Sequence, residues 1–283
     1  MTTPFREVVL RFGDAELRAT NRDDPWVVED LAGWFGGVGV KGDRTARLGH
    51  GDFPAPNKRT GRSLTLNLLW VGDVQARDHV SRALSGLFAD GEEGTLTARV
   101  GELVLTAQHV TLDGEVAVSE VGTVGVRAQV PLHAADPFLR SEARETHLRP
   151  IGSGVGLDYG LFSRDLGQGP VLSFGSAVDA RDWVWNDGNA ESFPLVTVTA
   201  NAPGGFAVSM GSSHVTFPWP TYPDMPVVVD MAGAVSVSGI DQSHLVSTRR
   251  WGGIAPSSVE SPTFEFLQGG TGFGVVSHCD TYL

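Results

Sequence analysis

The chain has 283 residues, of which 41% are hydrophobic, and its formal net charge is −12. An acidic surface repels the phosphate backbone, so this composition excludes general nucleic-acid binding. The sequence has no run of about 20 apolar residues, which is the length that a membrane-spanning helix needs. The single cysteine, Cys279, excludes an intrachain disulfide and fits synthesis in a reducing cytoplasm.

The N-terminal part predicts an antiparallel β domain. Alternating apolar residues place its strands near 6–12, 14–19, 62–71 and, in a run, from about 95 to 132. In the third strand one buried face is expected to carry Leu64, Leu66, Leu68 and Trp70. The Asp113-Gly114 dipeptide predicts a hairpin turn within the later run.

One helix is expected between these strands. Asp73 is a good N-cap residue, and Gly91 suits the left-handed position that ends a helix. The apolar residues at helical spacing are Ala76, Val80, Ala83, Leu84, Leu87 and Phe88. This pattern predicts a helix that packs one face on the sheet.

The segment 36–61 is rich in glycine and is too long for an ordinary hairpin loop. Long segments without periodicity are usually functional or become ordered against a partner. Gly37, Gly39 and Gly42 match the GxGxxG pattern in form, but no helix follows to hold a pyrophosphate. We therefore interpret the segment as an assembly loop and not as a nucleotide site.

The C-terminal part predicts a β-sandwich. We expect the first domain to cover 1–145, a polar and glycine-rich linker 146–168, and the sandwich 169–283. The predicted strands are the runs VLSF, WVWN, PLVTVTA, FAVSM, HVTFP, MPVVVDM, AVSVSG, PTFEFL and FGVVSH. The fold class is accordingly mainly β.

The sequence contains no motif that indicates catalysis. The eight histidines include no pair at the close spacing of metal ligands, and no GxSxG nucleophile motif occurs. Adjacent acidic pairs such as Asp23 and Asp24 are typical of solvated turns. We therefore expect no enzyme activity, no catalytic residues, no cofactor and no metal.

Trp183 and Trp185 are expected to share one face of a strand. Together with Trp219 and Trp251 they could form an aromatic platform for a sugar, because indole rings present flat apolar faces. Packing in the sandwich core explains the same tryptophans equally well. The sequence leaves both interpretations open.

The order of several short segments resembles the distal tail protein (Dit) family of long-tailed, siphovirus-type bacteriophages. In the N-terminal part these segments are LGHGDF at 48–53, Gly61-Arg62 leading into Leu64 and Leu66, the helix after Asp73, and Asp136-Pro137-Phe138. In the C-terminal part they are Asn186, Gly188, Asn189 and Ala190 before Pro194 and LVTV at 195–198, then VVVD at 227–230, and Pro262-Thr263-Phe264 with Gly269 and Gly270.

This resemblance implies a tail-tube-like β domain with one helix, followed by a galectin-like β-sandwich. It also implies a homo-hexameric ring at the virion tail tip that joins the tail tube protein to the tail hub and lets DNA pass. The further partners are the tape-measure protein and receptor-binding proteins, and synthesis takes place in the bacterial host.

The resemblance places the subunit interface near His50, Phe53 and Arg62, although Phe53 would serve equally well as an anchor in its own core. From the residues alone, the alternative function is a carbohydrate-binding adhesin. In that case the sandwich contacts a host glycan through Trp183 and Trp185.

Overall fold

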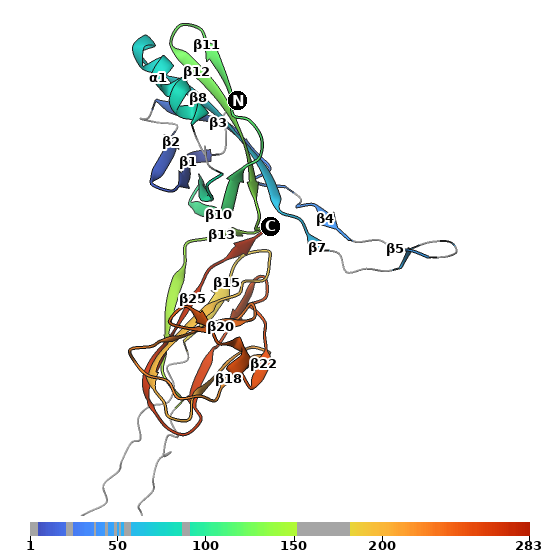
Figure 1. Ribbon diagram of the computed structural model, residues 1–283, viewed down its shortest axis with the longest axis vertical. Coiled ribbons are helices and arrows are strands. Elements are labelled where there is room, and N and C mark those ends of the chain that lie inside the picture. The colour runs from blue at the N-terminus through green and yellow to red at the C-terminus, as the bar shows by residue number, and fades with distance from the viewer. Residues whose placement is uncertain are drawn as a thin grey trace, which may run out of the picture. The chain divides into compact units, whose positions relative to one another are not determined.

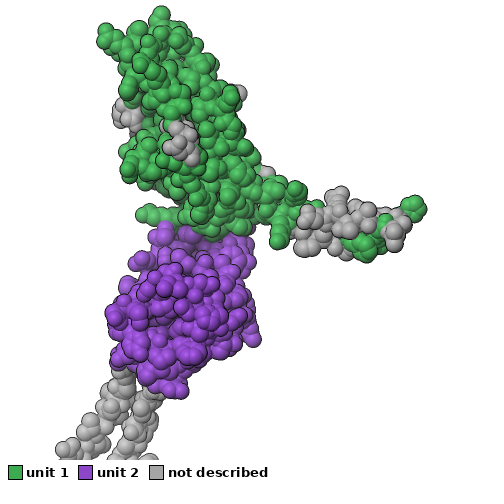
Figure 2. Space-filling view, in the orientation of Figure 1, with its two compact units in different colours: residues 1–142, 281–283 green, residues 143–280 purple. Residues whose placement is uncertain are grey.

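The computed structural model describes residues 5–20, 25–36, 38–42, 45–47, 50, 52–53, 58–86, 91–151 and 182–283. The described part is mainly β with one α-helix, as the sequence predicts. The chain divides into two compact units, coloured separately in Figure 2. Unit 1 comprises Met1–Glu142 with Thr281–Leu283, and unit 2 comprises Ala143–Asp280.

Unit 1 contains the only α-helix of the described chain, together with the first thirteen strands and the last one (Figure 1). The elements are β1 (Phe5–Phe12), β2 (Ala15–Thr20), β3 (Trp26–Ala32), β4 (Val40–Lys41), β5 (Thr45–Ala46), β6 (Asp52–Phe53), β7 (Lys58–Arg59), β8 (Arg62–Val71), α1 (Val74–Ser85), β9 (Gly94–Val100), β10 (Leu103–Leu112), β11 (Ala117–Val121), β12 (Gly125–Ala134), β13 (Leu139–Arg140) and β26 (Thr281–Tyr282).

Ten of these strands form one antiparallel sheet, whose main order is β2-β1-β9-β10-β12-β8-β3. The two end strands, β2 and β3, approach each other without forming a ladder through described residues. The sheet therefore curls toward a closed barrel, which leaves one side of nearly every strand facing a shared interior.

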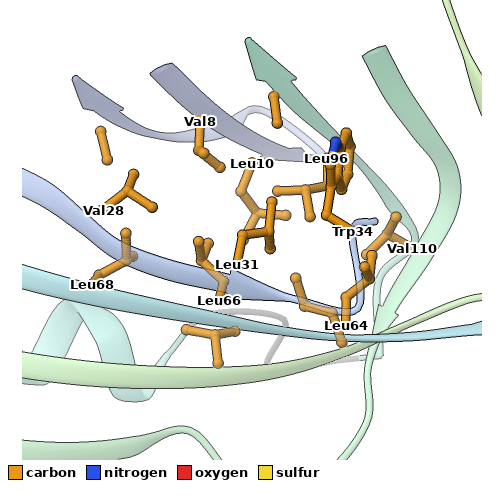
Figure 3. Packing of buried hydrophobic residues seen from close by; sticks show 14 of the residues in the cluster. Val8, Leu10, Val28, Leu31, Trp34, Leu64, Leu66, Leu68, Leu96 and Val110 are labelled. Atoms are coloured by element: carbon orange, nitrogen blue, oxygen red, sulfur yellow. The ribbon is translucent and has the colours of Figure 1, made fainter. Parts of the chain in front are cut away.

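The interior of unit 1 is filled by aliphatic side chains from facing strands (Figure 3). As predicted, β8 alternates, so that Leu64, Leu66, Leu68 and Trp70 are buried. Trp34 joins them from the turn after β3 and is fully buried. Each large apolar side chain removed from water contributes roughly 1.5–3 kcal/mol, so this face fixes the register of β8 against its neighbours.

Helix α1 covers part of the sheet with the predicted face. Leu84 is buried, and Ala76 and Val80 pack partly against the core. Asp73 occupies the N-cap position, but its side chain makes no capping hydrogen bond. The helix ends at Ser85, before the predicted left-handed Gly91, whose φ of 70° nevertheless has the expected sign. Leu87 and Phe88 lie outside the described residues.

Two local predictions in unit 1 are wrong. Strand β3 was not expected from the sequence, although it pairs with β8 over most of its length. The Asp113-Gly114 turn does not form a hairpin, because β10 and β11 do not pair with each other; both pair with β12, whose other edge is taken by β8. The turn therefore carries the chain along one edge of β12.

The described part of unit 2 contains the remaining strands and one short 3-10 helix, η2 (Ser243–Leu245). The strands are β14 (Arg144–Leu148), β15 (Val184–Asn186), β16 (Leu195–Asn201), β17 (Phe206–Met210), β18 (Ser213–Phe217), β19 (Val227–Asp230), β20 (Ala234–Val237), β21 (Ile240–Asp241), β22 (Thr248–Arg250), β23 (Ser258–Glu260), β24 (Thr263–Phe266) and β25 (Thr271–His278).

Two antiparallel sheets of unit 2 share one apolar core, which makes the unit a β-sandwich. The sheet orders are β14-β25-β16-β19-β20-β21 and β22-β18-β17-β24, and β15 pairs with β23 beside them. Val196 and Val198 of the first sheet and Phe206 and Phe264 of the second belong to the core. Every predicted strand of this part is present except VLSF, which lies outside the described residues.

The unit boundaries differ from the expected domain boundaries at both ends of the sandwich. The chain enters unit 2 after Glu142, and β14 occupies the start of the expected linker because it pairs with β25. The rest of that linker, from residue 152, lies outside the described residues. The chain returns to unit 1 after Asp280, where β26 pairs with β13.

Candidate assembly site

The segment between β3 and β8 forms an antiparallel hairpin arm, defined here as residues 38–60. Val40 pairs with Arg59 in the ladder β4–β7, and Ala46 pairs with Asp52 in the ladder β5–β6. The second ladder is nested inside the first along the chain, which is the register of one hairpin. The arm is therefore an extended ribbon and not the structureless loop that its glycine content suggested.

Among the residues of the arm whose side chains the structure describes, only Val38 is buried. Val40 is 59% exposed and Phe53 is 55% exposed. The guanidinium of Arg47 lies 5.0 Å from the centre of the Phe53 ring. A two-stranded ribbon without a packed face is marginally stable in water, so the arm needs a second surface for stable order. In Figure 1 the ladders lie outside the curled sheet.

The arm is basic although the protein is acidic. It contains five Lys and Arg residues and two Asp residues, which give it a net charge of +3, while the whole chain carries −12. Lys41, Lys58 and Arg59 are exposed on the β4–β7 ladder. This separation of charge makes an acidic surface the electrostatic complement of the arm.

The root of the arm is buried and held by Arg62. Its Nη1 donates to the carbonyl oxygens of Gly33 at 3.0 Å and Trp34 at 2.7 Å, and its Nε donates to that of Pro137 at 3.0 Å. Burial lowers the pKa of Arg62 below its usual range, because the charged guanidinium loses contact with water. Arg62 stands where the chain returns from the arm, and it bonds Gly33 and Trp34 where the chain leaves for the arm. It also bonds Pro137 before β13, so it fixes the direction in which the arm leaves the sheet.

Two glycines allow the close packing at this root. Gly33 has a φ of 81°, and a Cβ at this position would overlap the carbonyl oxygen of Ser63. A Cβ at Gly61 would overlap the imidazole of His133. Beyond the root, Thr60 donates its backbone N–H to the Gly39 carbonyl oxygen at 2.9 Å, which continues the ladder outward.

The three residues expected at a subunit interface fall in two different environments. His50 and Phe53 are exposed on the arm. Arg62 is only 3% exposed and bonds within its own unit, so it has no free surface for a neighbouring subunit. The burial of Arg62 could have been predicted from the sequence, because Arg62 stands at period two with the buried residues of β8.

The two tryptophans expected to contact a glycan are also in different environments. Trp183 precedes β15 and is 51% exposed. Trp185 lies under the guanidinium of Arg144, 4.5 Å from the ring centre, and makes an edge contact with buried His278. Arg144 in turn forms an ion pair with Asp280 at 2.6 Å. Trp185 is thus part of an internal cluster, and the pair does not form a free platform.

The other two tryptophans of the expected platform do not complete it. Trp251 packs against the core of unit 2. Trp219 follows β18 and donates its indole N–H to the Leu245 carbonyl oxygen at 3.2 Å. Within the described residues, no three His, Cys, Asp or Glu side chains gather as metal ligands, and no helix is long and apolar enough to span a membrane.

Comparison with known proteins gives a match at the level of structure alone. No protein-family model and no curated protein matches the chain. The Dit protein of phage SPP1, described as a hub of the adsorption apparatus in phages that infect Gram-positive bacteria, superposes with a TM-score of 0.61 at 11% identity. The superposition covers 98% of this chain and 99% of the SPP1 protein.

Two structures of the phage p2 baseplate in its activated conformation, one with Ca and one with Sr, also match. Their identities are 10% and 9%, their TM-scores are 0.48 and 0.49, and each match covers 96% of this chain and 97% of the other. The SPP1 likeness shows the fold: from end to end, this chain has the fold of a Dit subunit.

Proposed function

We propose that the chain is a structural subunit of a bacteriophage tail tip, a distal tail protein that forms a ring of six copies. The observation that carries this proposal is the match of the whole chain, including both units, to one Dit subunit. A fold shared by unit 1 alone would support only a tube-like domain. Both units together match a protein described as a hub.

In this proposal the hairpin arm is the contact between subunits. Its exposed Val40 and Phe53 supply apolar surface, and its charge of +3 faces copies whose remaining residues carry −15. Unlike charges speed the encounter of the copies and select the correct partner. The root held by Arg62 sets the direction of the arm, so that the contact repeats with the same geometry in every copy.

The partners on the two sides of the ring are the tail tube protein and the tail hub protein, with the tape-measure protein and receptor-binding proteins as further contacts. The subunit works through its interfaces and not as an enzyme. A channel through the ring would pass DNA best with an acidic wall, because such a wall repels the polyanion. The product is located at the tail tip of the virion.

The first test is the mass of the purified protein, measured by light scattering over a concentration series and imaged by negative stain. We expect a particle of six 30.1 kDa subunits with six-fold symmetry, formed alone or on addition of the tail tube protein. A protein that stays monomeric under both conditions contradicts the proposal.

A second test separates the arm from the fold. We expect replacement of residues 40–59 by a short Gly-Ser turn to abolish the ring and leave the unfolding transition of unit 1 in place. The control is the insertion of a Gly-Ser dipeptide between Gly122 and Thr123, at the exposed turn between β11 and β12, which should still assemble. Rings formed equally well by the arm-deleted chain would remove the arm from the interface.

A further inference from the structure

We infer that unit 2 carries a glycan-binding site at one loop end of the sandwich, formed by an exposed aromatic patch around Trp219. The patch is defined by four large exposed side chains: Trp219, Tyr222, Met225 and Leu267. They are 48%, 50%, 42% and 41% exposed, respectively. This inference concerns unit 2 alone and does not depend on whether the chain forms a ring.

Backbone contacts bring the loops of the patch together around the turn 202–205. Leu267 donates its N–H to the Gly205 carbonyl oxygen at 3.1 Å, and Gly205 lies close against the backbone of Trp219. Ala202 and Thr221 exchange two backbone hydrogen bonds of 3.3 and 3.1 Å. The loops that carry the four side chains therefore lie side by side at one end of the sandwich.

The patch is rigid before any ligand arrives. Prolines 218, 220, 223 and 226 restrict the backbone on both sides of the aromatic residues. The Met225 N–H donates to the Tyr222 carbonyl oxygen at 3.1 Å, which closes a tight turn between them. Binding would then cost little conformational entropy, because the loops are already ordered.

The chemistry of the rings favours the apolar face of a sugar. The only polar atom of the Trp219 side chain donates to the Leu245 carbonyl oxygen, so the exposed part of the indole presents carbon alone. On the same loops Asp224 and Gln268 are exposed, and neither side chain forms a hydrogen bond or ion pair within the described part of the chain. A carboxylate and an amide are suitable partners for sugar hydroxyls.

The size of the patch favours a small ligand over a protein. Half of a Trp or Tyr side chain leaves on the order of 100 Å² of ring exposed. With Met225 and Leu267 the four side chains present roughly 350 Å², which is less than half of the ~800 Å² that each partner contributes to a standard protein interface. Asp224 and the acidic composition of the chain disfavour an anionic sugar. The site is therefore suited to a glycan with neutral pyranose units.

The test is saturation-transfer NMR of the full-length protein with cellobiose, maltose, chitobiose, lactose and rhamnose. Each sugar is present at about 10 mM, which nearly saturates a site with a dissociation constant of ~1 mM. We expect transfer to the C–H protons of at least one sugar. Trp219→Ala should weaken this binding about tenfold or more, while Trp219→Phe, which keeps an aromatic ring, should retain part of it.

Trp183→Ala is the matched control, because Trp183 is equally exposed on the same unit but lies outside the patch. This variant should bind the sugar as the unaltered protein does. The inference is overturned if no sugar of the panel shows transfer, if Trp183→Ala loses binding as strongly as Trp219→Ala, or if Trp219→Ala binds the sugar as the unaltered protein does.

Discussion

The hairpin arm and its root lie next to each other in the sequence, but they are built in opposite ways. The arm is exposed, basic and held by two short ladders. The root is buried, and the guanidinium of Arg62 bonds three backbone carbonyl oxygens there. The difference teaches that the residues that stabilise unit 1 are not the residues proposed for assembly. Substitutions should therefore change the stability of unit 1 or the assembly of the ring, but not both.

The largest loss of stability is expected at the root. Arg62→Met removes a charged donor and leaves three carbonyl oxygens without their partner, which costs about 3–4 kcal/mol. The midpoint of the unit 1 transition should fall by roughly 10 °C, measured by calorimetry. Arg59→Met, an arginine on the exposed ladder, is the control and should shift it little. Equal shifts of the midpoint in the two variants would show that the root contributes no more to stability than the arm does.

Unit 2 also contains an arginine that bonds within its own unit, the partly buried Arg144. Arg144 pairs with Asp280 through two hydrogen bonds of 2.6 and 3.0 Å, and the side chains are 30% and 10% exposed. We expect Arg144→Met to cost about 2 kcal/mol in urea unfolding. Arg6→Met breaks the exposed pair with Glu102 and should cost less than about 0.5 kcal/mol. A similar loss of unfolding free energy for both pairs would show that burial does not determine how much an ion pair contributes to stability.

The same cluster predicts a pH dependence. Burial, followed by the nearby Arg144, lowers the pKa of His278 below its ordinary value of 6.5; Asp280 acts in the opposite direction. The unfolded chain then binds more protons than the folded one, so this contribution to stability is complete above about pH 6.5 and is lost as the pH falls toward the lowered pKa.

Urea unfolding of unit 2 between pH 7.5 and 5 should therefore show a declining free energy. His278→Gln should flatten the part of the slope that this residue causes, and His244→Gln, at an exposed turn, should leave it unchanged. A slope that persists undiminished in His278→Gln would assign the pH dependence to other groups.

The smallest effect on stability is expected on the arm. Reversing two exposed charges, in the double variant Lys58→Glu and Arg59→Glu, should change the free energy of unfolding by no more than about 0.5 kcal/mol. The same variant should weaken ring assembly, and high salt should weaken assembly of the unaltered protein, because screening acts on exposed charges. Assembly that responds to neither change would contradict an electrostatic role of the arm.

Most regular elements were predictable where apolar residues alternate along a strand or recur at helical spacing. The alternation of Leu64, Leu66 and Leu68 fixed the buried face of β8, and the helical spacing of Ala76, Val80 and Leu84 fixed the face of α1. Most strands of the sandwich were located in the same way. Strand β3 was missed because its residues, WVVEDLA, place Glu and Asp beside the apolar positions, and pairing with β8 overrides that composition.

The candidate sites depended on contacts that the sequence does not display. Arg62 and Phe53 were assigned the same role from their position in the chain, yet one is buried and the other exposed. Trp185 was grouped with Trp183 by spacing, but Arg144, distant in sequence, covers its ring. Trp219 was expected to share a platform with the other tryptophans, but the loops that meet at Gly205 place it near the loop of Tyr222 instead.

By itself the sequence determined the fold class, the position of the helix, the charge and the presence of an unusual segment between β3 and β8, because local periodicity and composition encode these directly. The tertiary structure decided which arginine anchors and which is exposed, and which tryptophan is covered. The physical reason is that burial and hydrogen-bond partners arise between residues far apart in the chain, as for Arg62 with Pro137 and Arg144 with Asp280.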